Sequence, residues 1–377
     1  MLFLKRRNLL LLILFQASMW TATQASSQEM NWTHFGLRPL GMGNAYVAVA
    51  DDYNALFYNP AGIARLKEWD GEFLNPALEV SPNTLSLLTD LLKMTSGSSS
   101  DSTKDMLELI EGQAGEIHNI SIGWTPHLVF PGFGFGIGLE LGGLMAFHRY
   151  PSVFLDVGPR IVAPFTFAMN FFENRLSLGY SLKVRVRGGV NHEFGIQDIE
   201  AFSSSSDDAN ATGTKKLDDF IEGGWGLGSD FGLLFTPIKV MEPTIGLSFT
   251  DIGGTPYTKL DVGDTAVGAP EQVLPAVNVG FSLKPIQSDT SYVMASADMH
   301  AINQPISYSK KVNLGVEWGY GSIIKVQGGL HQGYMSAGFQ FDVGLLVLRL
   351  ATWGQELGSV AGTTQDRRYA LQLKLLI

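Results

Sequence analysis

Residues able to do chemistry are few in this sequence, and their spacing does not assemble an active site. Seven histidines could act as bases, but no G-x-S-x-G stretch offers a serine nucleophile and no H-E-x-x-H stretch offers paired zinc ligands. There is no cysteine, so disulfides and thiol chemistry are excluded. The sequence therefore predicts a protein that is not an enzyme and that holds neither a metal nor a cofactor.

A ladder of basic residues is the strongest candidate for binding. Lys183, Arg185 and Arg187 alternate with apolar residues, so a β-strand would place all three on one face. An unpaired charge in a narrow space needs a partner, and a carboxylate suits a basic ladder. Two interpretations remain open: the ladder holds the carboxylate of a fatty-acid ligand, or it pairs with carboxylates of this chain, namely Asp51, Asp52 or Glu140.

The N-terminus predicts export. Basic residues at positions 5–7 precede the apolar run 9–15, and small and polar residues follow as far as Ala25. This order is typical of a cleaved signal peptide, here residues 1–25, and the apolar run is too short for a membrane-spanning helix. The formal net charge of −10 also argues against a nucleic-acid partner, which requires a basic face.

Most of the remaining chain alternates apolar and small or polar residues. In one such run, Val312, Leu314, Val316 and Trp318 share one face of a strand. Fourteen such strands are expected between residues 70 and 377, many of them longer than strands of soluble proteins. Alternation alone does not distinguish a soluble sandwich, with its apolar face inside, from a barrel whose apolar face meets lipid.

The connections between these strands favour the barrel. Long connections at 81–115, 191–223 and 253–273 alternate with tight turns, as extracellular loops alternate with periplasmic turns in bacterial outer-membrane barrels. We therefore predict an all-β fold, a transmembrane barrel of about 14 antiparallel strands over residues 70–377. In loop 81–115, leucines at helical spacing indicate a helix that either packs on the barrel rim or presents an apolar landing site: Leu85, Leu88, Leu91 and Leu92.

Residues 26–69 precede the first strand and are predicted to form a plug. A barrel of about eight strands is filled by its own side chains, so fourteen leave a lumen that needs closing. The compact stretch 36–66 is rich in small residues and partly helical in pattern. The chain is expected to carry it as a hatch inside the barrel.

The stretches G-M-G-N-A-Y-V-A-V-A-D-D and Y-N-P-A-G-I-A, at 41–52 and 58–64, resemble the N-terminal signature of the FadL/TodX outer-membrane transporters and of their PorV-like relatives. The resemblance implies a monomeric, hatch-plugged barrel in the outer membrane of a Gram-negative-type bacterium. It also implies passage of long-chain fatty acids or other hydrophobic compounds, or, for PorV-like relatives, service to protein secretion through a protein partner. The hatch residues that it implies are Gly41, Gly43, Ala45, Asp51, Asp52, Asn59, Pro60 and Ala61.

A Gly-rich strip suggests where a ligand could leave the lumen. Gly134, Gly136 and Gly138 remove side chains from the inward face of one strand, which leaves space and weakens strand pairing. A lateral portal is one interpretation of this strip. Ordinary small-residue lining of a barrel is the other.

Overall fold

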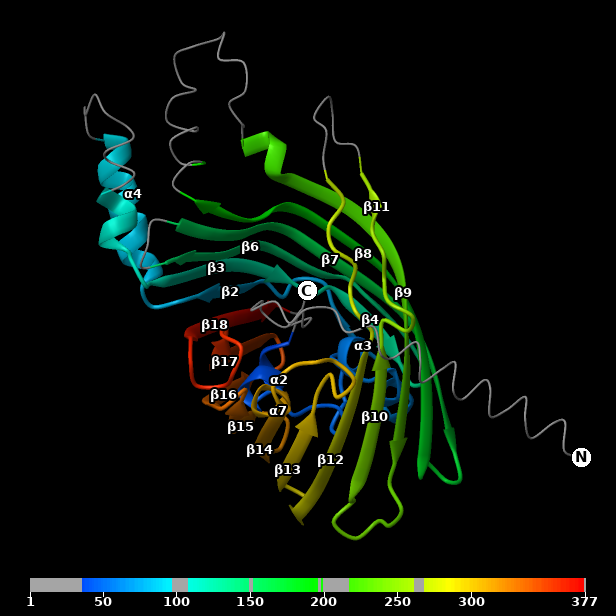
Figure 1. The fold of residues 1–377 in the computed structure, drawn as a ribbon. Coiled ribbons are helices and arrows are strands. Elements are labelled where there is room, and N and C mark those ends of the chain that lie inside the picture. Colours follow the sequence, from blue (N-terminus) through cyan, green and yellow to red (C-terminus); the bar gives the residue numbers. More distant parts are fainter. Residues whose placement is uncertain are drawn as a thin grey trace, which may run out of the picture.

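The computed structural model describes residues 36–96, 108–148, 152–195, 198, 217–260 and 268–375. The predicted signal peptide lies outside the described residues. All strands that the structure describes lie after residue 69 and belong to one antiparallel sheet (Figure 1). Its strands are β1 (Asp70–Glu72), β2 (Ala77–Val80), β3 (Ile117–Trp124), β4 (His127–Phe130), β5 (Phe133–Gly136), β6 (Gly138–Phe147), β7 (Ser152–Phe171), β8 (Leu176–Gly195), β9 (Ile221–Phe235), β10 (Thr244–Thr250), β11 (Thr258–Lys259), β12 (Ala276–Gln287), β13 (Ser291–Met299), β14 (Val312–Tyr320), β15 (Ile324–His331), β16 (Tyr334–Asp342), β17 (Leu346–Glu356) and β18 (Gln365–Leu375).

These strands form a closed barrel of fourteen. The pairs β1/β2, β3/β4 and β5/β6 are each one barrel strand with an interruption, and β11 continues β10 along β9. The last strand pairs with the first, Tyr369 opposite Val80 and Gln372 opposite Ala77, which closes the sheet. The predicted fold class is therefore confirmed within the described part of the chain.

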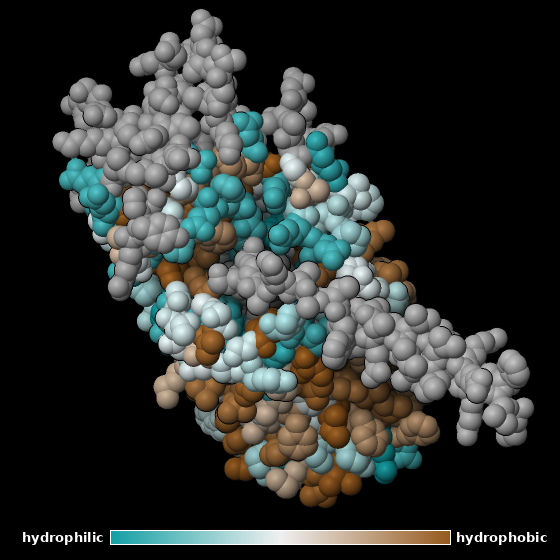
Figure 2. All heavy atoms as spheres, in the orientation of Figure 1, coloured by the Kyte–Doolittle hydropathy of each residue, from teal (hydrophilic) through white to brown (hydrophobic). Residues whose placement is uncertain are grey.

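The outward face of the barrel is the apolar one. On β14 the side chains of Val312, Leu314, Val316, Trp318 and Tyr320 are 41 to 49% exposed, whereas the intervening Asn313 and Glu317 are at most 1% exposed. A soluble sandwich would bury the apolar face, but a membrane barrel turns it toward lipid. Figure 2 shows the result: hydrophobic residues gather over the lower part of the molecule, and hydrophilic ones over the upper part.

The two long strands β7 and β8 take part of the predicted loop 191–223 into the sheet, because residues 191–195 of β8 pair with the start of β7. Each has 20 residues, and β8 continues to Gly195 before β9 begins at Ile221. In the third predicted loop, 253–273, the short strand β11 pairs with Trp225 and Gly224 of β9. The sheet therefore extends into the predicted loops at β7, β8, β9 and β11.

Helix α4 (Thr84–Ser96) confirms the helix predicted in the first long loop, but it uses a different face for packing. Leu87 is buried against Ile110, Phe147 and Val153. The predicted stripe instead faces away, since Leu85, Leu88 and Leu92 are 70, 40 and 68% exposed. The side chain of Leu91 lies outside the described residues. No helix among the described residues is long and apolar enough to span a membrane.

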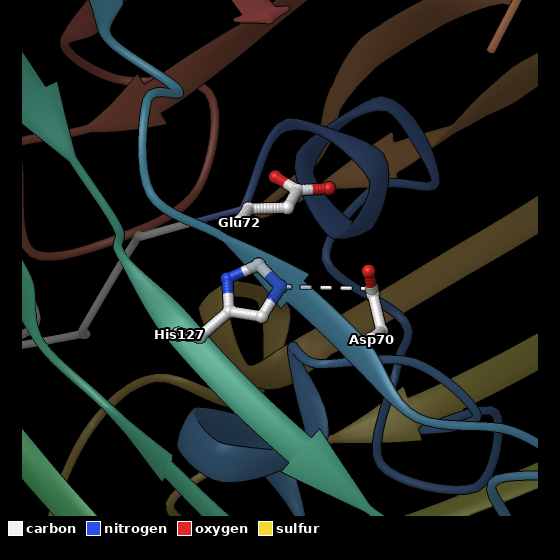
Figure 3. A group of neighbouring side chains, drawn as sticks. All are labelled: Asp70, Glu72 and His127. Carbon is white, nitrogen blue, oxygen red and sulfur yellow. Dashed lines mark ion pairs between the residues drawn. The ribbon is translucent and has the colours of Figure 1, made fainter. Parts of the chain in front are cut away.

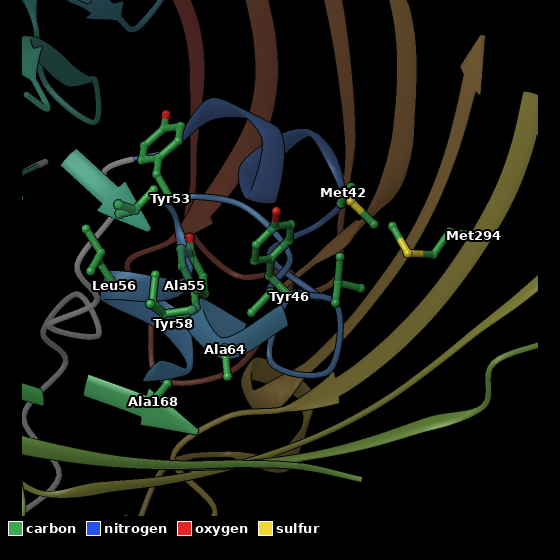
Figure 4. Packing of buried hydrophobic residues seen from close by; sticks show 13 residues of the cluster. Met42, Tyr46, Tyr53, Ala55, Leu56, Tyr58, Ala64, Ala168 and Met294 are labelled. Atoms are coloured by element: carbon green, nitrogen blue, oxygen red, sulfur yellow. The ribbon is translucent and has the colours of Figure 1, made fainter. Parts of the chain in front are cut away.

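Residues 36–66, called here the N-terminal segment, lie inside the barrel. The segment contains α2 (Leu37–Gly41), α3 (Ala55–Tyr58) and the 3-10 helix η1 (Pro60–Arg65). Its apolar side chains form the main buried cluster together with wall residues such as Ala168 and Met294 (Figure 4). The hydrophobic core of this barrel is thus built around the N-terminal segment. Two further short helices, η2 (Leu217–Phe220) and α7 (Tyr308–Lys311), each precede a barrel strand.

Candidate functional site

Side chains of the wall hold the backbone of the N-terminal segment on nearly every side. Each donates a hydrogen bond to a carbonyl group that the short, irregular helices leave without a partner. The distances lie between 2.6 and 3.1 Å. The donors are Asn170 on β7 to Ala64, Ser248 on β10 to Tyr58, Ser282 on β12 to Ala48, Ser296 on β13 to Ala45 and Ser336 on β16 to Gly41.

The glycines of the predicted signature lie where the backbone of the segment touches the wall. Gly43 has φ +63°, and a Cβ added there would stand 2.3 Å from the carbonyl oxygen of Leu314. Gly41 meets Gly338 of β16 so closely that a Cβ would stand 2.8 Å from its Cα. Only glycine fits both positions, because one needs a left-handed backbone and both lack room for a side chain.

Asn59 explains the Asn-Pro-Ala corner. Its Nδ2 donates to the carbonyl oxygens of Val47 at 2.8 Å and of Leu233 and Leu247 at 3.3 Å each. Its Oδ1 accepts the N–H of Ala61 at 3.2 Å and caps η1, with Pro60 at the first turn. One buried amide therefore ties the segment to two barrel strands.

Arg38 is the centre of the charges in the N-terminal segment. Its guanidinium makes a bidentate pair with Glu317 of β14, both bonds 2.7 Å long, and also donates to Asp51 at 2.7 Å and Asp52 at 2.9 Å. The Tyr46 hydroxyl accepts a further bond of 2.6 Å, and burial raises the pKa of Tyr46 well above its usual range. The acids Asp51 and Asp52 thus pair with an arginine of their own segment, not with the basic ladder.

The basic ladder pairs with wall carboxylates that sequence reasoning did not single out. Lys183 lies 2.6 Å from Asp230 and 3.0 Å from Asp251, and Arg185 lies 2.9 Å from Asp251. Arg187 pairs with Asp156 at 3.0 Å.

The expected pairing of the ladder with Asp51, Asp52 or Glu140 is therefore wrong. Glu140, the other expected partner, pairs with Arg160 at 3.2 Å. The reason is topological: β7 and β9 lie on either side of β8, β10 lies next to β9, and the carboxylates on or directly after these strands lie within reach of the ladder.

The Gly-rich strip faces the N-terminal segment. A Cβ at Gly134 or at Gly136 would stand 2.9 Å from Leu56 of α3, so the missing side chains make room for this leucine. The strand also breaks here: β5 ends at Gly136 and β6 begins at Gly138. A local weakness at this strip was expected, and the interruption at Ile137 lies within it.

Two neighbouring barrel strands are interrupted as well. Residues 73–76 separate β1 from β2, and Thr125-Pro126 separates β3 from β4. Pro76 and Pro126 have no N–H to donate to a ladder. The side chain of Asn75 bridges the gap, since it donates to the Thr125 carbonyl at 2.8 Å and accepts its N–H at 2.9 Å. Three adjoining strands therefore lack a continuous ladder of hydrogen bonds.

A pocket opens inside the barrel beside these interruptions. It lies between helix α2 and the strands β2, β3 and β18, so the N-terminal segment forms one of its walls. Its apolar lining comes from both sides, and its polar lining residues include Thr125 at the break. The residues around it are Leu37, Leu40, Ala77, Glu79, Ser121, Gly123, Trp124, Thr125, Glu140, Ala370 and Gln372.

A cluster of Asp70, Glu72 and His127 lies at the other side of the break (Figure 3). The His127 Nε2 and Asp70 Oδ2 atoms are 3.6 Å apart, and Tyr53 of the segment stacks on the imidazole with ring centroids 3.9 Å apart. Glu72 already pairs with Arg349 at 3.2 Å and Lys374 at 2.5 Å. These two cations supply the positive charge that a metal ion would otherwise bring, so we assign no metal to this cluster.

Comparison with known proteins shows a likeness in fold. No family model and no curated protein sequence matches the chain. Among solved structures, the CymD monoaromatic hydrocarbon channel matches with a TM-score of 0.50 at 12% identity, over 92% of this chain and 97% of that one. A Pseudomonas aeruginosa FadL homologue (12% identity, 92% and 99% covered, TM-score 0.49) and the Pseudomonas putida toluene transporter TodX (12% identity, 92% and 98% covered, TM-score 0.48) are also similar.

Proposed function

We propose that this chain, which has a FadL/TodX-like fold, is an outer-membrane channel through which hydrophobic compounds pass without an energy source. The barrel is closed, and the outward face of its strands is apolar, which supports a location in the outer membrane. Long-chain fatty acids and other hydrophobic small molecules are the proposed ligands. The protein is proposed to act as a monomer, after removal of its signal peptide.

One observation carries this proposal: three adjoining strands are interrupted side by side, and a small pocket of about 30 Å³ beside α2 lies at this break. A hydrophobic compound in the lumen can enter the membrane sideways only where strand pairing leaves a gap. Gly134, Gly136 and Gly138 line one side of that region, and we propose this region as the lateral portal. Across the break, the side chain of Asn75 bonds to the backbone of Thr125 and takes the place of ladder hydrogen bonds.

The N-terminal segment is proposed to be the gate. Gly41, Gly43, Ala45, Asn59, Pro60 and Ala61 contact the wall directly or shape the turns that do, and Asp51 and Asp52 are held by Arg38. Because α2 is one wall of the pocket, a shift of this helix would change the pocket itself. Gating then requires only that the segment move, while the barrel remains closed.

Uptake by whole cells tests the channel. The variant Gly123→Phe should fill the pocket, since the nearest atom to an added Cβ, that of Ala77, is 3.7 Å away and the substitution meets no clash at its base. In cells that lack a hydrophobic-compound channel of their own, wild-type protein should raise the uptake of labelled toluene and oleate. Gly123→Phe should return uptake to the level of cells without the protein.

The matched control is Ile122→Phe, which adds the same ring on the neighbouring, lipid-facing position, 54% exposed. It should leave uptake unchanged. Both variants should show the shift in mobility on unheated gels that marks a folded barrel. Equal uptake by Gly123→Phe and wild type would rule out this pocket as the route.

A role as a PorV-like partner of protein secretion is the second candidate, and helix α4 favours it. Leu85, Leu88 and Leu92 form an exposed apolar stripe at a loop, where a protein partner could dock. Replacing the three leucines with serine should abolish secretion of a dependent cargo and leave toluene uptake intact. Unchanged secretion of the cargo by this variant would favour the channel function alone.

A further inference from the structure

His127 on β4 is a buried histidine that contacts the strand break, the wall and the N-terminal segment at the same time. It is 4% exposed, and its Nδ1 lies 2.9 Å from the carbonyl oxygen of Thr125. The same oxygen accepts the bond from Asn75 that bridges the break. Tyr53 of the segment stacks on the imidazole ring. The protonation state of His127 therefore bears on both the bridge and the proposed gate.

The bond to Thr125 determines which ring nitrogen carries the hydrogen in the neutral imidazole. A carbonyl oxygen only accepts, so Nδ1 donates and Nε2 is left with a lone pair. Nε2 is buried without a hydrogen-bond partner among the described residues, and it points at Asp70, whose Oδ2 lies 3.6 Å away (Figure 3). A buried acceptor that faces a carboxylate is unfavourable, whereas a proton on Nε2 would turn the contact into a charge-assisted bond.

The charges of the wall that face His127 sum to zero without it. Asp70 and Glu72 on β1 are negative, and one oxygen of each lies within 4.8 Å of a ring nitrogen of His127. Arg349 on β17 and Lys374 on β18 are positive, and both pair with Glu72. Lys374 is also 3.7 Å from the other oxygen of Asp70, and β5 places a glycine opposite His127. Since both cations lie nearer to Glu72, Oδ2 of Asp70 is left to pair with Nε2.

Tyr53 makes the N-terminal segment sensitive to the charge of His127. The two rings are nearly parallel, with an angle of 8° between their planes. A cation is attracted to the face of an aromatic ring more strongly than a neutral group is. Arg349 already lies 5.7 Å from the centroid of this ring, and the neighbouring Asp52 is bonded to Arg38. A positive imidazole would therefore hold Tyr53 more firmly than a neutral one.

We propose that His127 is a proton-binding site that fastens the N-terminal segment to the strand break. The proton comes from water, which reaches the site through Asp70, whose side chain is 38% exposed. With the proton bound, Nε2–H donates to Asp70 and the positive ring holds Tyr53. As the pH rises and the proton leaves, both attractions are lost, so the segment is held more firmly at low pH than at high pH. The inference rests on the proposed channel function and names a regulator of its gate.

A single introduced thiol tests this proposal, because the chain has no cysteine of its own. Leu56 is 1% exposed, and a Cβ added at Gly136 would meet both Leu56 and His127, so Leu56→Cys places a thiol against the wall beside the histidine. A maleimide reagent reaches this thiol only when the segment moves away from the wall. Labelling rates of the purified full-length protein in detergent are measured at about pH 5 and about pH 8, the range in which histidine ordinarily changes charge.

Thiols themselves react faster at high pH, so each rate is divided by that of Leu56→Cys/His127→Phe at the same pH. Phenylalanine retains a ring on which Tyr53 can stack but cannot bind a proton. His127→Gln gives a second reference without a proton. The corrected rate should rise about tenfold from pH 5 to pH 8, as the loss of one charge-assisted hydrogen bond provides.

Two further variants, made with the same introduced thiol, separate the proposed pair from other histidines. Asp70→Asn keeps the size of the partner and removes its charge, so most of the corrected rise should disappear. His118 is a buried histidine on β3, in the same barrel strand as β4, and it contacts Phe147. His118→Phe should leave the rise unchanged. All variants should show the gel mobility of a folded barrel.

The outcomes distinguish this inference from the proposed gate. Equal corrected rates at the two pH values, a rise that survives in Asp70→Asn, or a rise that is lost in His118→Phe would each overturn the inference, while a labelled thiol would still support a moving segment. If the thiol of the folded barrel is labelled at neither pH, but is labelled after unfolding, the segment does not move. Both the gate and its regulation by His127 would then be wrong.

Discussion

Asn59 shows how much one side chain contributes to holding the N-terminal segment. Replacing it with Ala removes the cap of η1 and leaves the carbonyls of Val47, Leu233 and Leu247 without this donor. Each buried group left unsatisfied costs about 1–3 kcal/mol. We expect Asn59→Ala to lower the free energy of unfolding by at least that amount, measured by urea titration in lipid vesicles.

Asn59→Ser separates the two roles of this amide. Serine retains an oxygen that can cap η1 but cannot reach across as the Nδ2 donor does. We expect Asn59→Ser to be nearly as unstable as Asn59→Ala. A stability close to that of wild type would mean that the cap, and not the bonds to the wall, is what matters.

Arg38 is the main charged link between the N-terminal segment and the wall. Arg38→Met leaves Glu317 buried and unpaired, and breaking such a pair typically costs about 3–5 kcal/mol. We expect the variant to release the segment, so that limited proteolysis cuts within residues 36–66 while the barrel stays intact. The double variant Arg38→Met/Glu317→Gln removes both charges and should recover part of the resistance to protease.

At the scale of the strand, substitutions on β14 can test whether its apolar face is turned toward lipid. Val316 is 49% exposed near the middle of the strand, between outward residues of the same kind. A lysine on a lipid-facing position at the bilayer midplane costs about 2–4 kcal/mol, but about 0–1 near the interface. Val316→Lys should therefore destabilise the barrel far more than Tyr320→Lys at the strand end, as measured by refolding into lipid vesicles. Equal effects would contradict a lipid-facing β14.

The strands could be predicted because a period of two is written locally in the chain. Interior interruptions were harder to foresee, although Pro76 and Pro126 stand at two of them and a proline inside a strand signals a break. The strip at Gly134 and Gly136 was noticed for its missing side chains. The side chain that fills this space, Leu56, could not be predicted from the strip, because its position depends on how the N-terminal segment packs.

The partners of charged residues could not be predicted from the sequence, because they depend on which strands become neighbours. Lys183 finds Asp230 and Asp251 only when β9 lies beside β8 and β10 lies beside β9. Arg38 was missed, although it is one of only two basic residues in the stretch 36–66 and stands ahead of the acidic pair. That composition was an available signal for a local partner of Asp51 and Asp52.

At the scale of the whole molecule, the ion conductance of the barrel should depend on whether the N-terminal segment is present. In planar bilayers we expect the wild-type protein to conduct few ions, because the segment lies inside the barrel and is bonded to strands on several sides of it. Deleting residues 36–66 should open a lasting ion conductance, provided that the variant still shows the gel mobility of a folded barrel. A folded deletion variant that conducts no better than wild type would mean that other parts of the chain close the lumen.

The position of the N-terminal segment also has a consequence for the order of assembly. Arg38 and Glu317 are separated by 279 residues, and Gly41 and Ser336 by 295, so the segment is synthesised long before its partners. Contacts this distant in sequence form late, because the intervening chain must first be brought together. The bonds of the segment to β14 and β16 therefore form only after most of the wall has been made, whereas its bonds to β7 and β10 join parts of the chain that lie nearer in sequence. An early part of the chain is then among the last to complete its contacts, and we expect closure of the barrel and completion of the contacts of the N-terminal segment to coincide.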